Sequence, residues 1–346
     1  MAPRSRKRSP CAKCRITGAG PGVRGWTWLP HTRNIVGLAS SVPSHLKKLS
    51  GSICALATPF RADALDLDAF GRLIDWQLAG GTQALVVAGS TGEAHALDSD
   101  EFERLLAFAV SRVAGRVPVL AGTGTANTRK TIAATRRAQA CGADAALVVT
   151  PYYVRPTQDG LVRHFSEVAD HGGLPIVLYN VPSRTGCDML PATVGRLAHH
   201  GGIVGLKEAR GDAERISAVI ALQNPQFSIL SGDDATCMGA MLAGADGVIS
   251  VAANVAPEAL RALCDAALAR DAETARRVDA ALAALYELLG VEPNPIPLKW
   301  CLHRLGIGEP DLRAPLLPLS PAHRERADRV VASLPGMVQA RHSDAA

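Results

Sequence analysis

Lys207 is the residue of this chain best suited to nucleophilic chemistry. It follows the apolar run 203–206 and precedes Glu208. Burial in apolar surroundings favours the neutral amine of a lysine, and a neutral amine attacks carbonyl carbons to form an imine. A lysine that only leaves a strand end for solvent is the competing interpretation. The polar residues expected beside Lys207 decide between the two.

Phenols and hydroxyls follow other apolar runs of the same kind. Three of the four tyrosines, Tyr152, Tyr153 and Tyr179, lie at or just beyond the ends of two such runs, and Ser90 and Thr91 follow a third. If the ends of these runs meet in space, one lysine faces several groups that can donate and accept protons. Convergent polar groups of this kind are typical of an active site.

The elements that would bring these residues together are eight apolar runs alternating with amphipathic helical patterns. Continuous apolar strands indicate a parallel sheet buried on both faces, and eight strand–helix units predict an α/β fold, the (β/α)8 TIM barrel. A doubly wound open sheet requires a glycine-rich turn after its first strand, and residues 58–60 read Thr-Pro-Phe. The expected strands are Ser52–Ala57, Ala84–Val87, Val117–Ala121, Ala145–Val149, Pro175–Leu178, Ile203–Leu206, Phe227–Leu230 and Gly247–Ser250. The expected barrel helices are Asp66–Ala79, Ser99–Val113, Thr128–Ala140, Gln158–Ala169, Leu190–His199, Asp212–Leu222, Asp234–Ala243 and Pro257–Ala269.

The chain divides into three parts on these patterns: residues 1–50, a catalytic barrel at 51–270 and a C-terminal helical appendage at 271–346. In a TIM barrel the catalytic residues lie at the C-terminal ends of the strands, which is where Lys207 and the tyrosines fall. The appendage is of a kind that often holds contacts between subunits. Its expected helices are Ala272–Leu289, Ile296–Leu305 and Pro321–Leu334.

Residues 1–50 hold ten of the 37 Lys and Arg residues and none of the 32 Asp and Glu residues, so the rest of the chain carries a net charge of −5. This acidic body gives no argument for nucleic-acid binding. The basic segment is interpreted as a disordered extension, with an organelle transit peptide or a start codon placed too far upstream as alternatives. Cys11 and Cys14 have CxxC spacing, but no second pair of ligands lies nearby to complete a zinc site.

The remaining composition argues for a reducing compartment and against a membrane span. Eight cysteines are scattered, mostly within apolar segments, which is typical of reduced, buried thiols. No apolar run is long enough to cross a bilayer. These observations predict a cytoplasmic protein with no membrane partner.

Three motifs resemble the dihydrodipicolinate synthase family, which belongs to the pyruvate-dependent class I aldolases together with N-acetylneuraminate lyase. They are Gly-Ser-Thr-Gly-Glu at 89–93, Tyr-Asn-Val-Pro-Ser-Arg-Thr-Gly at 179–186 and Gly-Leu-Lys-Glu-Ala at 205–209. The resemblance implies a lyase that condenses pyruvate with L-aspartate 4-semialdehyde through a lysine Schiff base. That reaction is the first committed step of lysine and diaminopimelate biosynthesis, and it requires no metal and no cofactor.

The resemblance also implies catalytic roles for four residues. Lys207 is expected to form the Schiff base, and Tyr179 to relay protons above it. Tyr153 is expected to act in the active site of a neighbouring subunit, in a homotetramer built from two tight dimers. Ser90 would link the two phenols, at a position where many family members have threonine.

Four further residues are implied to bind substrate. Thr91 matches the site of the pyruvate carboxylate, and Arg184 matches the arginine that receives the carboxylate of aspartate semialdehyde. A planar guanidinium suits that task because it can bind a carboxylate through two parallel hydrogen bonds. Gly232 and Ile249 resemble backbone positions that line the substrate pocket.

Two other functions remain open at this point. The first is another pyruvate-dependent aldolase or lyase, either similar to N-acetylneuraminate lyase, where serine also stands at the position of Ser90, or a retro-aldolase of a 2-oxo acid. Arg184 and Glu208 favour the synthase. The second is a degenerate barrel kept for binding, which would be expected to lose Lys207 or the tyrosines.

Feedback inhibition by lysine is predicted to be weak or absent. Ala126 and Lys130 stand where inhibited members of the family tend to have Asn and Glu. A cation at Lys130 would repel a lysine ligand.

Overall fold

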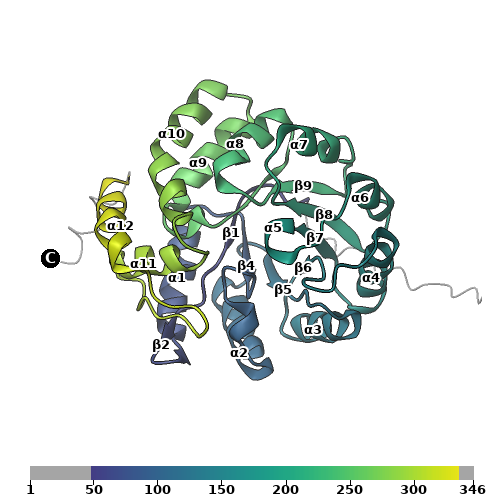
Figure 1. Cartoon of the computed structure of the whole chain (residues 1–346), viewed down its shortest axis with the longest axis horizontal. Coiled ribbons are helices and arrows are strands. Elements are labelled where there is room, and N and C mark those ends of the chain that lie inside the picture. Colours follow the sequence, from purple (N-terminus) through teal and green to yellow (C-terminus); the bar gives the residue numbers. More distant parts are fainter. Residues whose placement is uncertain (1–47, 335–346) are drawn as a thin grey trace, which may run out of the picture. The chain divides into compact units, whose positions relative to one another are not determined.

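Eight parallel strands form a closed barrel in the computed structural model, which describes residues 48–334. Consecutive strands of the barrel are paired, and β1 closes it by pairing with both β4 and β10. Helices surround the strands (Figure 1), which confirms the predicted (β/α)8 TIM barrel. The strands are β1 (Gly51–Ala55), β4 (Ala84–Val87), β5 (Val119–Gly122), β6 (Ala145–Val149), β7 (Ile176–Asn180), β8 (Ile203–Glu208), β9 (Ser228–Ser231) and β10 (Gly247–Ser250).

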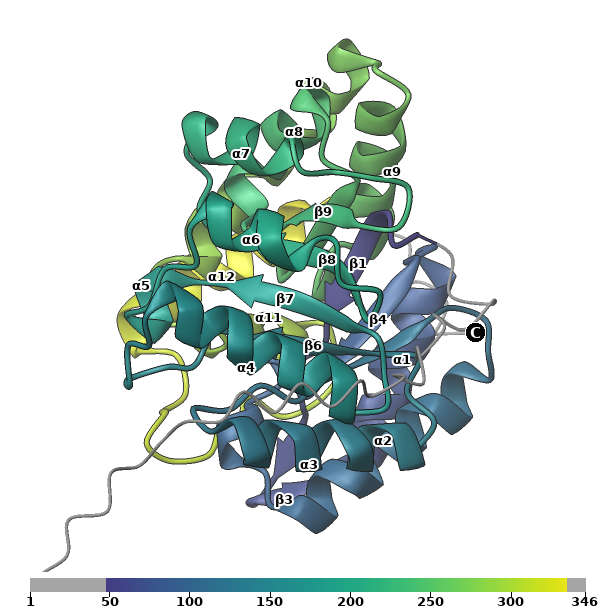
Figure 2. The same ribbon diagram turned by 90° about the vertical axis from the view of Figure 1, so that its right-hand side faces the viewer.

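The long helices agree with the predicted ones to within a few residues at each end. Helices α4 and α6 pack on each other beside the strands β7 and β8 (Figure 2). Beyond the barrel, α10 packs on α8 and α9, and α12 packs on α10 and α11. The helices are α1 (Leu67–Ala79), α2 (Ser99–Val113), α3 (Thr128–Ala140), α4 (Gln158–His171), α6 (Pro191–Leu197), α7 (Ala213–Ile220), α8 (Asp234–Ala243), α9 (Pro257–Leu268), α10 (Ala272–Leu289), α11 (Ile296–Arg304) and α12 (Pro321–Ser333).

Several short elements were not predicted, because they are too short to leave a periodic pattern. The strands β2 (Phe60–Arg61) and β3 (Ala64–Leu65) form a hairpin whose two loop residues, Ala62 and Asp63, both have positive φ, as a tight hairpin turn requires. The helix α5 (Pro182–Thr185) follows β7 directly. Two short 3-10 helices are η1 (Ala94–Ala96) and η2 (Ala252–Asn254).

The interior of the barrel is filled by side chains, so the site must lie at its mouth. Alternate residues of each strand enter two separate hydrophobic clusters, one inside the barrel and one between the strands and the helices. In β4, for example, Ala84 and Val86 point inward, and Leu85 and Val87 pack against the helices.

An irregularity in β8 decides which way Lys207 points. Pairing with β7 begins at Ile176 and Ile203, and one β8 residue is then skipped before the register resumes at Gly205. Ile203 packs outside the barrel, and strict alternation would place Lys207, four residues later, on that same side. The extra residue reverses the alternation. Lys207 therefore faces inward, paired with Tyr179.

Some predictions fall on residues that the structure does not describe. The predictions for residues 1–47, including the CxxC pair Cys11 and Cys14, lie outside the described residues. So does the end of the predicted C-terminal appendage, residues 335–346. Within residues 48–334, none of the helices has both the length and the apolar character that crossing a membrane would require. The same residues contain no group of His, Cys, Asp and Glu that could hold a metal ion.

Candidate active site

Lys207 and Tyr179, here called the imine pair, lie side by side at the carboxyl ends of β8 and β7. The Nζ atom of Lys207 is 4.5 Å from the centroid of the Tyr179 ring, within the range of a cation–π contact. The two residues are only 4% and 8% exposed. No carboxylate of residues 48–334 lies within 4.0 Å of this Nζ atom. The amine is thus buried beside a phenol and free of any ion pair with the described residues.

A cavity of about 190 Å³ opens above the imine pair. Its volume is below the roughly 300–1,000 Å³ of pockets that hold drug-sized ligands, so it suits small substrates. Six of the eight residues predicted for the site line this cavity: Ser90, Thr91, Tyr179, Arg184, Lys207 and Gly232.

Gly232 leaves the space that the lysine side chain occupies. A Cβ atom at this position would lie 2.9 Å from Cε and 3.1 Å from Cγ of Lys207, closer than carbon atoms pack without strain. The backbone N–H of Gly232 donates to the carbonyl of Glu208 at 2.7 Å, which continues the ladder beyond the ends of β8 and β9.

Two predicted residues lie away from the cavity. Ile249 is fully buried inside the barrel and, within the described chain, is not part of the cavity lining. Tyr153 is 89% exposed and has a φ of 70°. Its backbone N–H donates to the carbonyl of Thr185 at 3.1 Å, which ties its loop to α5, and its side chain does not line the cavity.

Asn294 is a site residue that the analysis of single residues missed. Its Nδ2 donates to Oγ1 of Thr91 at 3.0 Å, and its backbone carbonyl accepts from Nη2 of Arg184 at 3.2 Å. It therefore connects two predicted substrate-binding residues across the cavity that all three line. Its signal in the sequence is the stretch Pro-Asn-Pro at 293–295. This stretch lies far along the chain from the strand ends, where a TIM barrel is expected to hold its catalytic residues.

A buried ion pair anchors the loop 89–93, which carries Ser90 and Thr91. Nζ of Lys299 lies 3.0 Å from Oε1 of Glu93, and both side chains are almost fully buried. The other oxygen of Glu93 accepts from the backbone N–H of Arg313 at 3.1 Å. The loop is thereby attached to α11, which contains Lys299, and to the segment after it, which contains Arg313.

A second nucleophilic residue lies on the side of the barrel wall that faces the helices. Cys54 of β1 is fully buried. Burial raises the pKa of its thiol well above the ordinary value, Asp234 raises it further, and the charge of Lys207 opposes the rise. Because the thiolate is the reactive form of cysteine, Cys54 does not compete with the lysine amine.

These features define a class of enzyme. A buried lysine at the C-terminal mouth of a TIM barrel, beside a phenol and below a guanidinium, is suited to forming an imine with a small carbonyl compound that carries a carboxylate. Proton transfers to and from that imine need a group such as the phenol of Tyr179 within reach.

Comparison with known proteins gives the family. Residues 48–334 match the model of the dihydrodipicolinate synthetase family, and the chain belongs to that family. It is 60% identical over 285 residues to the 4-hydroxy-tetrahydrodipicolinate synthase of Xanthomonas axonopodis pv. citri, covering 82% of this chain and 94% of the relative. It is 57% identical over 287 residues to the enzyme of the same name from Stenotrophomonas maltophilia strain K279a, covering 83% and 96%.

Solved structures agree with this assignment. The chloride-inhibited dihydrodipicolinate synthase from Acinetobacter baumannii, in complex with pyruvate, superposes with a TM-score of 0.80 at 41% identity, covering 82% of this chain and 98% of the other. Dihydrodipicolinate synthase from Aquifex aeolicus gives a TM-score of 0.80 at 42% identity, with coverage of 82% and 97%.

Proposed function

We propose that this chain is a 4-hydroxy-tetrahydrodipicolinate synthase that condenses pyruvate with L-aspartate 4-semialdehyde. The observation that carries the proposal is the placement of Lys207 against the Tyr179 ring, 4.5 Å from its centroid, below a cavity of small-substrate size. The family relationship and the identity of 57–60% to synthases support the same function.

The reaction runs through covalent intermediates on Lys207. Its amine adds to the keto carbon of pyruvate, water leaves, and an iminium forms. Loss of a methyl proton gives an enamine, whose carbon forms a bond to the aldehyde carbon of the second substrate. The amine of that substrate then displaces Lys207 and closes a six-membered ring. The iminium itself serves as the electron sink, so the chemistry needs neither a metal nor an organic cofactor.

The site residues divide between proton transfer and binding. Tyr179 hands protons to and from the imine and connects through Ser90 to Tyr153 of a second copy. Thr91 binds the pyruvate carboxylate, and Arg184 binds the carboxylate of the second substrate. Gly232 and Ile249 contribute backbone positions to the substrate pocket.

The position of Tyr153 supports an assembly in which subunits complete one another's sites. The neighbouring residues Tyr152 and Val154 are also exposed, at 45% and 54%. Three exposed apolar side chains in succession are suited to an interface with a second copy. The proposal includes a homotetramer of two such dimers. It also includes a cytoplasmic location, which fits the six free cysteines among the described residues.

Sensitivity to lysine is proposed to be weak or absent. A cavity of about 780 Å³ adjoins the site, and its lining includes His95, Phe102, Lys130 and Tyr152. The ammonium group of Lys130 would repel a lysine ligand there.

Reductive trapping tests the proposed function. Incubation with pyruvate and borohydride should add one reduced pyruvyl group at Lys207, which peptide mass spectrometry locates. Pyruvate with aspartate semialdehyde should give cyclic product, and N-acetylneuraminate should not be cleaved. Trapping with cleavage of N-acetylneuraminate would favour the lyase instead, and no trapping at all would exclude both enzymes.

A further inference from the structure

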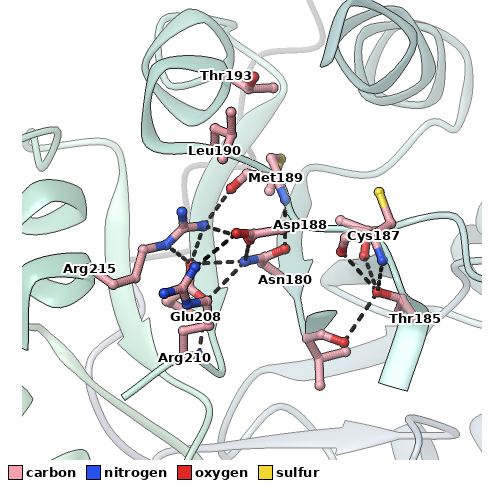
Figure 3. A network of polar contacts seen from close by, with 12 residues as sticks. Asn180, Thr185, Cys187, Asp188, Met189, Leu190, Thr193, Glu208, Arg210 and Arg215 are labelled. Carbon is pink, nitrogen blue, oxygen red and sulfur yellow. Dashed lines mark hydrogen bonds and ion pairs between the residues drawn. The ribbon is translucent and has the colours of Figure 1, made fainter. Parts of the chain in front are cut away.

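Asn180 and Glu208 directly follow the two members of the imine pair and are themselves paired in the register of β7 and β8. Neighbouring residues of a strand point to opposite faces, so these side chains meet behind the imine pair, outside the barrel. Both are buried, at 0% and 1% exposure. Nδ2 of Asn180 lies 3.0 and 3.2 Å from the two carboxylate oxygens of Glu208 (Figure 3).

The carboxylate of Glu208 is surrounded by donors. Oε1 accepts from the backbone N–H of Arg210 at 2.9 Å, and Oε2 accepts from Nε of Arg215 at 2.8 Å. Burial raises the pKa of the Glu208 carboxyl, and the hydrogen bonds from Arg210, Arg215 and Asn180 oppose that rise. A buried carboxylate held by donors on both oxygens has one orientation available to it.

The same network reaches the segment that follows α5, the helix that carries Arg184. Oδ1 of Asn180 accepts from the backbone N–H of Met189 at 3.0 Å, and its Nδ2 donates to Asp188 at 2.8 Å. Arg215 contacts Asp188 at 3.3 Å and also donates to the carbonyl of Met189. One cluster thus connects the ends of β7 and β8 with Asp188 and Met189, in the segment that follows α5 (Figure 3).

We propose that Asn180, Glu208 and Arg215 form a positioning cluster for the reaction. It fixes the ends of β7 and β8 and, through Asp188 and Met189, the segment that follows α5. The Tyr179 ring, the Lys207 amine and the Arg184 side chain thereby keep one mutual geometry. In the described chain none of the three lines the cavity above the imine pair, so the cluster acts through other residues. The inference rests on the proposed function, because it assigns the cluster to the rate at which Lys207 forms an imine.

The variant Glu208→Gln tests the cluster with almost no change in volume. All the contacts of the carboxylate come from donors, so either orientation of the glutamine amide places its NH₂ against Asn180 and one of the two arginines. At least one hydrogen bond must break. We expect the rate of imine formation with pyruvate to fall on the order of 100-fold. Borohydride trapping in a quenched-flow instrument measures this rate. We also expect a higher KM for aspartate semialdehyde.

Asp246→Asn is the matched control. Asp246, like Glu208, has a carboxylate that accepts a backbone N–H, from Ile229 at 2.8 Å, and pairs with a cation, Lys48 at 2.8 Å, but it lies at the opposite, N-terminal end of the barrel. Changes at that end affect stability more than chemistry. We expect a lower Tm and an imine rate within about a factor of two of wild type.

The outcomes separate this inference from the proposed function. An E208Q protein that forms the imine at the wild-type rate, or a D246N protein slowed to the same extent, overturns the positioning role. Absence of trapping in wild type overturns the proposed function instead. If E208Q does not fold, Asp188→Asn takes its place, because the Asp188 side chain is 26% exposed. The expected loss is then about tenfold, and an unchanged rate overturns the inference.

Discussion

The described chain buries two lysines to nearly the same degree, in regions that use them differently. Lys207 is 4% exposed and Lys299 is 1% exposed. At the junction with the C-terminal helices, Lys299 meets the carboxylate of Glu93 and donates to the carbonyls of Thr58 and Asp311. At the mouth of the barrel, Lys207 has a phenol ring and a cavity in place of such acceptors.

The difference is the one expected between a structural lysine and the reactive lysine that we propose. Burying a charge costs several kcal/mol, which a partner of opposite charge and full hydrogen bonding can offset. Burial lowers the pKa of Lys299, and Glu93 opposes that change. A lysine that is to attack a carbonyl must keep its amine unengaged. The proposed active site therefore lacks the stabilising contacts that Lys299 has at the junction.

Removal of the Lys207 amine should have the largest effect. Lys207→Arg keeps a cation at the site, but a guanidinium does not form an imine under these conditions. We expect a loss of at least about 10³-fold in kcat/KM and no mass increase after trapping with pyruvate and borohydride. Near-normal product formation by K207R would show that the comparison assigns the wrong lysine to catalysis.

Removal of the Lys299 ammonium should act on stability. Lys299→Met leaves Glu93 buried without its cation, which is expected to lower the free energy of unfolding by about 3–5 kcal/mol. Urea unfolding measures this, and the folded protein should still be trapped at Lys207. The double variant E93Q/K299M should recover part of the loss, because it removes the unpaired charge. K299M with wild-type stability would contradict the structural role.

His164 extends the comparison to a third buried base. It is 4% exposed, its Nδ1 lies 2.9 Å from Oγ1 of Thr128, and its Nε2 has no hydrogen-bond partner among the described residues. Burial lowers its pKa from 6.5 to about 4. Between these two pH values the unfolded chain binds more protons than the folded one, so stability falls as the pH is lowered. This lowering of the pKa corresponds to a loss of about 3 kcal/mol in the free energy of unfolding when the pH falls through this range.

His164→Gln should remove this contribution. Between pH 7 and pH 4 the variant is expected to lose about 3 kcal/mol less of its unfolding free energy than wild type does. Urea titrations at the two pH values measure both losses, and the carboxylates that titrate in this range contribute equally to both proteins. The same pH dependence in wild type and H164Q would show that His164 is protonated as easily in the fold as in the unfolded chain.

Crowding at Lys207 should have a smaller effect. Gly232→Ala puts a methyl group within 3.1 Å of two side-chain carbons of Lys207, so the amine must shift, and imine formation is expected to slow by about tenfold or more. Gly239→Ala is the control, because a Cβ atom there meets nothing within 4 Å. G239A lies within α8 and should be slightly more stable, by about 0.5–1 kcal/mol, with an unchanged rate. Equal rates in the two variants would contradict the need for space.

Lysine should have the smallest effect, weak or absent. Isothermal titration of the protein with lysine at millimolar concentrations is expected to show no tight binding, and lysine should slow the reaction little or not at all, because Lys130 lines the adjoining cavity. Tight binding of lysine would mean that the cation at position 130 is turned away from the ligand. Lys130→Glu, which reverses the charge, tests that directly.

The fold was readable from the chain because its signals are local. Each apolar run is a property of four to six consecutive residues, and each helical pattern of ten to eighteen. Local contacts also begin the helices: the side chains of Asp66 and Asp233 cap the backbone at the starts of α1 and α8. The C-terminal ends of parallel strands share one face of the barrel, which is sufficient to predict that Thr91, Tyr179 and Lys207 lie close together.

The rest of the site depends on contacts between distant parts of the chain. Asn294 reaches Thr91 across 203 positions, and Lys299 reaches the carbonyl of Thr58 across 241. The periodic patterns of the sequence do not indicate contacts between residues so far apart. The sequence shows Asn294 only as a polar residue between two helical patterns, and packing decides that it lines the site.

The direction of Lys207 separates the two kinds of information most clearly. Its type, its place at the end of a strand and its neighbours in the motif were determined by the sequence. Its inward orientation was decided by the one extra residue of β8 between Ile203 and Gly205. Side chains alternate along a strand with a period of two, so a single insertion exchanges the two faces. Whether a strand contains that insertion depends on its pairing with both neighbours, which exists only in the closed barrel.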